Sequence, residues 1–395
     1  MHKTTEDPSV PRSDAAATAR GHLACVVGAR PNFVKMAPLL RALGAYSGIR
    51  VTLVHTGQHY DDSLFDVFFA DFGMPRPDVS LEVGSGRHGA QSAKVLERFE
   101  AFLDQAKEQG TPCHRVLVVG DVNSTMAAAL AAVKLGIPVA HVEAGLRSFD
   151  RSMPEEINRV VTDAVSDLLF VSEPSGMDNL RREGQPEERL HLVGNVMIDT
   201  LHWLLPKARA LDAPRRHGLS PGNYGVVTLH RPSNVDDPTT LRRLVDVLTE
   251  TSRELPLAFP IHPRTKQRIA ANGLADRLDA ARGIMQFPPL GYLEFLALVA
   301  DSRLIVTDSG GLQEETTALG IPCLTFRPNT ERPITIEQGT NTLIGDDTAA
   351  LRHHLRSILE GVYKRGRCPE LWDGQAANRI AAVLAESLTA KYHDR

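Results

Sequence analysis

The sequence predicts an α/β protein with two Rossmann-like domains, each built on a doubly wound parallel sheet, and a ligand cleft between them. Two observations lead to this fold class. Short runs of β-branched and apolar residues alternate with amphipathic stretches along most of the 395 residues, which is typical of βαβ units. One plan also occurs twice: "LVVGDVNSTMAAALAAVKLGIPVAHV" and "LIVTDSGGLQEETTALGIPCLTF" both run from an apolar strand through Asp into a helix that ends at Leu-Gly-Ile-Pro.

The predicted strands follow the chain in two groups. The first half contains "HLACVVGAR", "RVTLVHTG", "RVLVVGD" and "IPVAHVEAG", separated by helical patterns such as "FVKMAPLLRAL" and "STMAAALAAVKLG". The second half contains "YGVVTLHR", "LAFPIHPRT", "IMQFPPL", "RLIVTDSGG" and "IPCLTFRP". Gly136 and Gly320 are predicted to end their helices, and Pro138 and Pro322 to prevent continuation.

These groups divide the chain into domains. Residues 1–20 mix charge, proline and alanine, so we expect a disordered tail and no signal peptide. The first Rossmann-like domain is expected over 21–200 and the second over 201–375, with a hinge in the Pro-, Gly- and charge-rich stretch 204–225.

Composition excludes several classes of function. Lys+Arg 44 against Asp+Glu 48 gives a net charge of −4, and aromatic residues make up only 5%, so a nucleic-acid partner is not expected. No apolar run is long enough to span a bilayer. The four cysteines are scattered without C-x-x-C spacing, which indicates neither a zinc site nor a disulfide framework. We therefore expect a cytoplasmic protein without a bound metal.

Polar residues directly after the predicted strands should line the cleft, because ligands of open α/β sheets bind at the carboxyl ends of the strands. "GARPNFVK" places Arg30 and Lys35 at the first such corner, where two cations could hold a diphosphate. The alternative is that Arg30 caps its own loop and that Lys35 lies on the surface.

Three acids follow later strands of the first half. Asp121 and Glu143 come after strands, and Glu155 opens a helix near Pro154. If they converge, they can divide acid and base roles between them. The alternative for Glu155 is a surface ion pair with Arg159, four residues further on. In the second half, His230 and Arg231 end a strand as a candidate phosphate-contacting pair.

Taken together, these motifs resemble the non-hydrolysing UDP-N-acetylglucosamine 2-epimerase family. The resemblance rests on "GARPNFVKMAPLL", "TGQHYD", "GDVNST", "HVEAGLRS", "MPEEINR", "LVGNVMID", "LHRPSNVDD", "VTDSGGLQEE" and "RPNTERP", which occur in the family's order across about residues 22–346. It implies a GT-B-type fold that binds a UDP-sugar in the interdomain cleft, a homodimer, no cofactor, and a C-terminal helix at about 376–395 that crosses back to the first domain.

The resemblance also implies a reaction. The family inverts C2 of UDP-N-acetylglucosamine to give UDP-N-acetylmannosamine, by elimination of UDP to 2-acetamidoglucal and re-addition. Matched motif by motif, the catalytic residues are Asp121, Glu143, Glu155 and His230. The matched binding residues are Arg30, Lys35, Arg147, Arg159, Phe295, Ser309, Gly310, Gly311, Glu315 and Arg332.

Within "DSGGLQEE", position separates the roles. Ser309, Gly310 and Gly311 are expected to meet the diphosphate at a helix N-terminus, and Glu315 to accept from the ribose hydroxyls. Glu314 is expected to point elsewhere and to complement the helix dipole.

Some motifs depart from the family pattern. This chain reads "GARPN" and "HRPSN" where many bacterial members read G-T-R-P-E and H-R-R-E-N, and it has "GQHYDD" where substrate-activated members carry Gln-His-Arg. The same pattern occurs in relatives that act on modified sugars such as UDP-2,3-diacetamido-glucuronate. Three other functions stay open: a GT-B glycosyltransferase using an NDP-sugar, a hydrolysing epimerase, and a sugar-nucleotide sensor without turnover.

Overall fold

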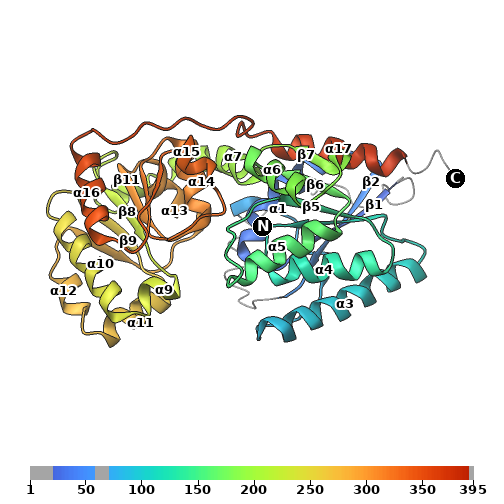
Figure 1. Ribbon diagram of the computed structural model, residues 1–395, viewed down its shortest axis with the longest axis horizontal. Coiled ribbons are helices and arrows are strands. Elements are labelled where there is room, and N and C mark those ends of the chain that lie inside the picture. The colour runs from blue at the N-terminus through green and yellow to red at the C-terminus, as the bar shows by residue number, and fades with distance from the viewer. Residues whose placement is uncertain (1–20, 58–70, 391–395) are drawn as a thin grey trace, which may run out of the picture.

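The computed structural model describes residues 21–57 and 71–390, which form two α/β domains side by side (Figure 1). The predicted tail at residues 1–20, most of "GQHYDD" and the last five residues of the expected C-terminal helix lie outside this description. Among the described residues, no helix combines the length and the apolar character needed to cross a bilayer.

The first domain is built on a seven-stranded parallel sheet in the order β3-β2-β1-β4-β5-β6-β7. Its strands are β1 (Gly21–Val27), β2 (Ile49–His55), β3 (Val79–Ser80), β4 (Arg115–Val119), β5 (Val139–Ala144), β6 (Leu168–Val171) and β7 (Leu190–Leu192). The helices are α1 (Arg30–Leu43), α3 (His88–Glu108), α4 (Asn123–Lys134), α5 (Pro154–Val165) and α6 (Pro174–Arg182), with a short 3-10 turn at Glu187–Arg189.

The second domain repeats the plan with six parallel strands in the order β10-β9-β8-β11-β12-β13. These are β8 (Gly225–Thr228), β9 (Leu257–Pro260), β10 (Ile284–Phe287), β11 (Leu304–Thr307), β12 (Cys323–Thr325) and β13 (Asn341–Leu343). Around them lie α9 (Pro232–Val235), α10 (Pro238–Thr251), α11 (Pro263–Ala271), α12 (Ala275–Asp279), α13 (Tyr292–Ala300), α14 (Gly310–Leu319), α15 (Ile334–Glu337) and α16 (Thr348–Leu359). The predicted fold class, two doubly wound sheets, is confirmed.

The ends of the helices follow the local sequence signals. Pro31 and Pro154 lie in the first turns of α1 and α5, where the missing proline N–H costs no intrahelical bond. Gly136 and Gly320, predicted to end helices, both adopt a left-handed backbone with φ of +72° after α4 and α14. In each case a strand follows within a few residues, at β5 and β12.

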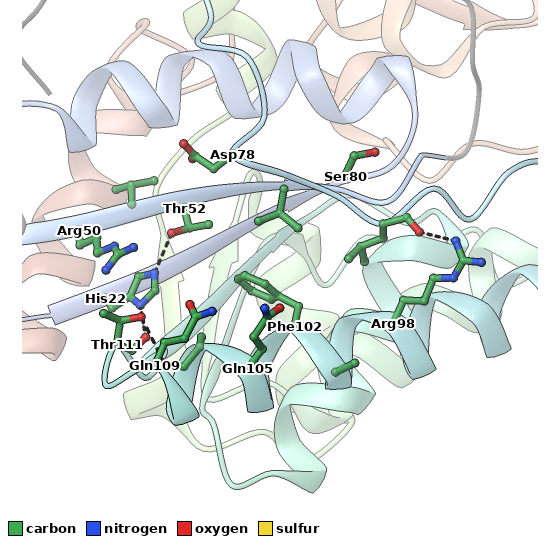
Figure 2. A pocket seen from close by; sticks show the side chains of 15 residues that line it. His22, Arg50, Thr52, Asp78, Ser80, Arg98, Phe102, Gln105, Gln109 and Thr111 are labelled. Carbon is green, nitrogen blue, oxygen red and sulfur yellow. Dashed lines mark hydrogen bonds between the residues drawn. The ribbon is translucent and has the colours of Figure 1, made fainter.

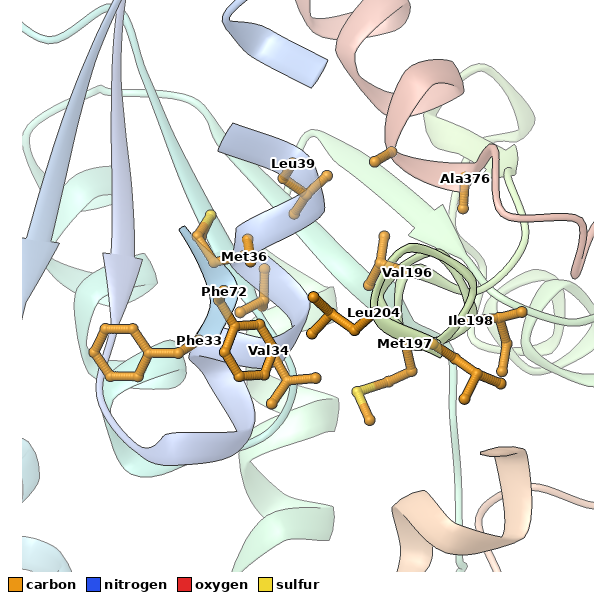
Figure 3. Packing of buried hydrophobic residues seen from close by; sticks show 14 of the residues in the cluster. Phe33, Val34, Met36, Leu39, Phe72, Val196, Met197, Ile198, Leu204 and Ala376 are labelled. Carbon is orange, nitrogen blue, oxygen red and sulfur yellow. The ribbon is translucent and has the colours of Figure 1, made fainter. Parts of the chain in front are cut away.

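Helix α7 (Val196–Ala210) joins the two domains and packs against both. Figure 3 shows its apolar side chains meeting those of α1, among them Val34 and Leu39, and the buried core continues to α13 of the second domain. Thr200 adds a hydrogen bond to the Val34 carbonyl at 2.6 Å. Much of the expected hinge at 204–225 is therefore helical, in α7 and α8 (Ala213–Arg216), because buried Leu204 and Ala208 anchor it despite its prolines.

The chain ends with α17 (Ala376–Ala390), which packs on α1, α7 and β1 of the first domain. An extended segment carries the chain across from the second domain to reach it (Figure 1). The return is fixed by polar contacts: the backbone N–H groups of Ala376 and Ala377 donate to Asp199 at 3.1 and 2.6 Å. The Trp372 indole N–H donates to the Ser172 carbonyl at 3.0 Å.

Candidate functional site

The candidate site lies where the strand order reverses in both sheets, after β1 and β4 of the first and after β8 and β11 of the second. Ligands of doubly wound sheets bind at such switch points. A cleft of about 490 Å³ opens here with walls from both domains. The predicted residues that line it are Lys35, Asp121, Glu155, Arg159, His230, Phe295, Ser309, Gly310, Gly311, Glu315 and Arg332.

Glu143 does not itself line the cleft, but it contacts Lys35, which does. The pairing of β5 with β6 shifts register between Val142 and Ala144, and Glu143 has a left-handed backbone with φ of +71°. Bulges of this kind redirect a side chain and recur next to active sites. The buried Glu143 carboxylate forms a salt bridge with Lys35 and lies 3.9 Å from the guanidinium of Arg332 in the other domain.

Gly120 makes room for this salt bridge. It has a φ of +67°, and a Cβ at this position would lie 3.0 Å from the Lys35 Nζ and 3.4 Å from the Glu143 Oε2. Contacts that short require the neighbouring atoms to move, so glycine suits both the backbone and the packing here.

A second cluster of opposite charges is centred on Arg159 of α5, at the wall of the cleft. Arg159 Nη1 lies 2.5 Å from Asp121 Oδ2, and its Nη2 lies 2.6 Å from Glu156 Oε2. Glu156 is fixed in turn by the backbone N–H groups of Ser148 and Phe149, which donate at 2.9 and 2.8 Å. The alternative of a Glu155–Arg159 ion pair is therefore wrong, and Glu155 faces the cleft half-buried.

Arg332 connects the acids of the two domains. Its Nε lies 2.9 Å from Glu314 Oε1, and its Nη1 forms a salt bridge with Glu331. Burial lowers the pKa of Arg332, but Glu314, Glu331 and Glu143 together raise it well above the ordinary value. The guanidinium is thus permanently charged and already surrounded by carboxylates.

The N-terminus of α14 opens into the cleft at the turn that the sequence singled out. The helix begins at Gly310 with Ser309 as its N-cap, and the Ser309 side chain makes no capping hydrogen bond. The first-turn N–H groups of a helix lack intrahelical partners and attract anions. A Cβ on Gly310 would lie 3.0 Å from both Arg332 Nη1 and Glu331 Oε1, so the turn packs closely against the arginine.

The two glutamates of "DSGGLQEE" lie beyond the first turn of α14, and their contacts differ. Glu315 accepts a hydrogen bond from the Tyr292 hydroxyl at 2.9 Å, and burial raises its pKa to about 7. Glu314 accepts from the Asn195 amide at 2.7 Å and pairs with Arg332. Burial also raises the pKa of Glu314. The expectation that Glu314 points elsewhere as a dipole complement is wrong, because its carboxylate is buried against Arg332 at the cleft wall.

His230 follows β8 and is held by Asp308, the residue directly after β11. Its Nδ1 lies 2.7 Å from Asp308 Oδ1, and the Asp308 side chain is fully buried. Burial raises the pKa of Asp308, but His230 and the backbone N–H groups of His230 and Arg231 lower it below the ordinary value overall. Asp308 is therefore ionised, and Nε2 is the ring nitrogen left for a ligand.

Besides Glu143, two predicted residues are not seen among the lining residues. Arg147 forms a two-point contact with Glu183 at 2.8 and 2.7 Å and also pairs with Asp163 at 2.7 Å. Its guanidinium is thus bound within the first domain, away from the cleft. Arg30 begins α1, but its side chain lies outside the described part of the structure.

Sequence reasoning assigned no role to several residues that line the cleft, among them Met153, Met197 and Tyr292. Tyr292 follows β10 by a few residues, so the strand-end rule could have found it. Met153 and Met197 carry no comparable signal, because apolar residues at helix starts are common in cores.

A larger cavity of about 570 Å³ lies elsewhere in the first domain, between α3 and the strands β1 to β3 (Figure 2). Its central polar group, His22, contacts Thr52 at 2.8 Å and the Thr111 carbonyl at 3.0 Å. Arg98 donates to the Leu81 carbonyl at 2.6 Å. These groups are satisfied by the protein and bring no acids together, so we assign the chemistry to the interdomain cleft. Nowhere in the described ranges do three or more His, Cys, Asp or Glu side chains form a metal-binding group.

Comparisons with known proteins agree with this geometry. The model of the UDP-N-acetylglucosamine 2-epimerase family matches residues 41–385. The UDP-N-acetylglucosamine 2-epimerase of Methanocaldococcus jannaschii is 41% identical over 367 residues, which cover 92% of this chain and 98% of that protein. The UDP-2,3-diacetamido-2,3-dideoxy-D-glucuronate 2-epimerase of Pseudomonas aeruginosa is 38% identical over 366 residues, covering 91% and 98%.

The fold is also shared. A crystal structure of the M. jannaschii UDP-GlcNAc 2-epimerase in complex with UDP-GlcNAc and UDP matches with a TM-score of 0.82 and 39% sequence identity, over 92% of this chain and 99% of that one. The two Rossmann-like domains thus form a GT-B-type fold, as the resemblance implied. These matches extend over nearly the whole length of this chain and of each protein compared with it, and the chain therefore belongs to the UDP-N-acetylglucosamine 2-epimerase family.

Proposed function

We propose that the protein interconverts UDP-N-acetylglucosamine and UDP-N-acetylmannosamine by inverting C2 of the sugar. One observation carries the proposal: carboxylates of the first domain, Asp121 and Glu155, share a single cleft with the α14 N-terminus and His230 of the second. Groups that can perform acid–base chemistry at a carbon atom thus lie beside a site suited to a diphosphate. Family membership and a relative solved in complex with UDP-GlcNAc and UDP support the same reading.

In this proposal the second domain binds UDP. The N–H groups of Gly310 and Gly311 and the Ser309 hydroxyl donate to the diphosphate, as helix N-termini commonly do. The His230 imidazole, two residues after β8, adds a further donor. Glu315 accepts from the ribose hydroxyls.

Phe295 would pack on the uracil at the other end of the nucleotide. It is half-buried in α13 and lines the same cleft. Aromatic rings stack readily on bases, which is consistent with this assignment.

The first domain would handle the sugar. A carboxylate removes the C2 proton, the electrons of the C2–H bond form a C1–C2 double bond, and the C1–O bond breaks so that UDP leaves with its bonding pair. The product is 2-acetamidoglucal. UDP then adds back to C1 on the same face, and C2 takes a proton from the opposite side. Asp121, Glu143 and Glu155 are the proposed acid–base groups.

Between the two steps UDP and the glucal are no longer bonded to each other, and both must stay in the cleft. A cleft that excludes water prevents hydrolysis of such an intermediate. The salt bridge from Arg332 to Glu143 crosses from the second domain to the first, and we propose that it holds the cleft closed.

A modified sugar is the second candidate. The P. aeruginosa relative that is 38% identical is named for UDP-2,3-diacetamido-2,3-dideoxy-D-glucuronate. Relatives of this chain are thus named for 2-epimerisation of sugars that carry different substituents. We therefore propose testing both UDP-sugars in parallel. We further propose, from the family resemblance alone, a cytoplasmic homodimer, and sedimentation of the purified protein tests its dimeric state.

The decisive experiment incubates the purified protein with UDP-N-acetylglucosamine in D₂O and follows it by NMR. We expect deuterium at C2 together with UDP-N-acetylmannosamine. A C2 proton that stays unexchanged with either UDP-sugar would overturn the proposal, and release of UDP with free N-acetylmannosamine would identify a hydrolysing epimerase instead. Glu155→Gln should lower exchange, whereas the control Glu183→Gln, which changes an acid outside the cleft, should exchange at the wild-type rate.

A further inference from the structure

Asp308 is a buried acid of the site that the proposed reaction does not use. Its Oδ2 accepts from the backbone N–H groups of His230 and Arg231 at 3.0 and 2.9 Å and from the Asn234 amide at 3.0 Å. Its Oδ1 faces the His230 Nδ1 at 2.7 Å. The side chain is 0% exposed, so protein groups and not water satisfy this carboxylate.

This arrangement settles the protonation pattern of the imidazole. A carboxylate that is ionised can only accept, so the nitrogen facing it must carry a proton. Nδ1 therefore bears a hydrogen, and Nε2 is presented to the cleft, where the His230 side chain is 42% exposed. Three other donors hold Oδ2, so the carboxylate cannot turn away from the ring.

We propose that Asp308 is a positioning residue for His230, which lets the imidazole hold protons on both nitrogens while a diphosphate occupies the cleft. The inference rests on the proposed function, in which a diphosphate leaves as an anion at this point. Nε2–H then donates to the departing diphosphate, and Asp308 stabilises the positive ring from behind. No proton is transferred in this contact, because the proton on Nδ1 stays on the ring and is donated to the Asp308 carboxylate as a hydrogen bond throughout.

The test is Asp308→Asn. The amide oxygen can replace Oδ2 opposite its three donors, which leaves the amide NH₂ facing the His230 Nδ1. The ring must then accept at Nδ1 and keep its single proton on Nε2, so it stays neutral. The neutral ring can still donate from Nε2 but lacks the positive charge beside the departing diphosphate, so we expect kcat to fall about 10²-fold, a loss typical of weakening one donor to a developing anion. The Kd for UDP should rise by only about tenfold, since the α14 N-terminus is unchanged.

Three measurements decide the proposal. Nitrogen NMR of protein labelled with ¹⁵N-histidine and saturated with UDP should show both ring nitrogens of His230 protonated, the signal being assigned by its loss in His230→Gln. In Asp308→Asn, Nδ1 should become unprotonated. The double variant Asp308→Asn/His230→Gln should turn over as slowly as His230→Gln alone, because Asp308 acts through the ring.

The control is Asn234→Ala. It removes another hydrogen bond to Asp308, at 3.0 Å, and one to the Phe326 carbonyl, but leaves the Asp308–His230 contact in place. We expect its kcat to fall less than about fivefold, whereas a loss equal to that of Asp308→Asn would indicate a purely structural role and overturn the proposal.

The wild-type measurement keeps the proposal testable even if Asp308→Asn does not fold. An unprotonated Nδ1 in the UDP complex overturns the inference directly. This readout needs only UDP, so it is independent of whether UDP-N-acetylglucosamine is epimerised, and failure of C2 exchange overturns the proposed function alone.

Discussion

Replacing Glu143 with glutamine should destabilise the protein through Lys35 more than through Arg332. Lys35 is 7% exposed, and Glu143 is the one acid within salt-bridge distance of it among the described residues. Arg332 keeps Glu314 and Glu331 when Glu143 loses its charge. Removing one partner of a buried ion pair costs about 3–5 kcal/mol. Since the amide oxygen can still accept from Lys35, we expect a loss near the lower limit, about 3 kcal/mol.

The double variant Lys35→Met/Glu143→Gln isolates the stability cost of the unpaired Lys35 charge. Methionine removes the unpaired charge at similar volume, and replacing both members of a buried pair is often close to neutral. The double variant should therefore regain stability to within about 1 kcal/mol of the wild type.

Urea unfolding and C2 deuterium exchange are the two assays. In Glu143→Gln we expect UDP binding to be largely intact, because Glu143 is not a lining residue, and turnover to fall severely. Near-normal exchange in this variant would refute a catalytic role for Glu143. A double variant as unstable as the single one would refute the assignment of the cost to Lys35. Glu183→Gln, next to the buried Arg147, serves as the control in both assays.

Two further predictions concern stability. Burial raises the pKa of Glu173 to about 7 from an ordinary 4.5, so between these pH values the folded protein holds a proton that the unfolded chain has lost, and stability falls as pH rises. Urea unfolding of Glu173→Gln should lack this component, about 1.4 kcal/mol per pH unit, and equal slopes in both proteins would contradict it. Gly194→Ala should destabilise by more than about 2 kcal/mol, because Gly194 has a φ of +86° and a Cβ there would lie 2.0 Å from the Leu371 carbonyl oxygen. Thermal unfolding measures this loss, and an unchanged midpoint would show that residues near 371 can shift freely.

The sequence predicts the location of the site better than its contacts. Lys35, Asp121, His230 and Ser309 lie in one cleft because each follows a strand, and the carboxyl ends of parallel strands share one edge of a sheet. Strand periodicity is strong in this chain, so that rule needs no tertiary information. The pairing of two such edges across a cleft follows from the repeated plan.

The choice of ion-pair partners depends on details that the sequence leaves open. Spacing favours Glu155 for Arg159, since they are four residues apart. The structure selects Glu156, because two backbone N–H groups of the loop 148–149 already fix that carboxylate beside the arginine. The redirection of Glu143 likewise depends on a bulge in β5 that no local residue pattern announces.

The distribution of charge assigns different tasks to the cations of the cleft. Arg332 already faces Glu314, Glu331 and Glu143, so it has little net attraction left for a diphosphate. Lys35 is likewise neutralised by Glu143. An incoming anion therefore meets the N–H groups at the start of α14, the His230 imidazole and Arg231, which was predicted to contact phosphate together with His230 and which also lines the cleft. Arg332 instead joins acids from both domains, so a change in how the domains close changes the surroundings of Glu143, one of the three carboxylates proposed for acid–base chemistry at C2.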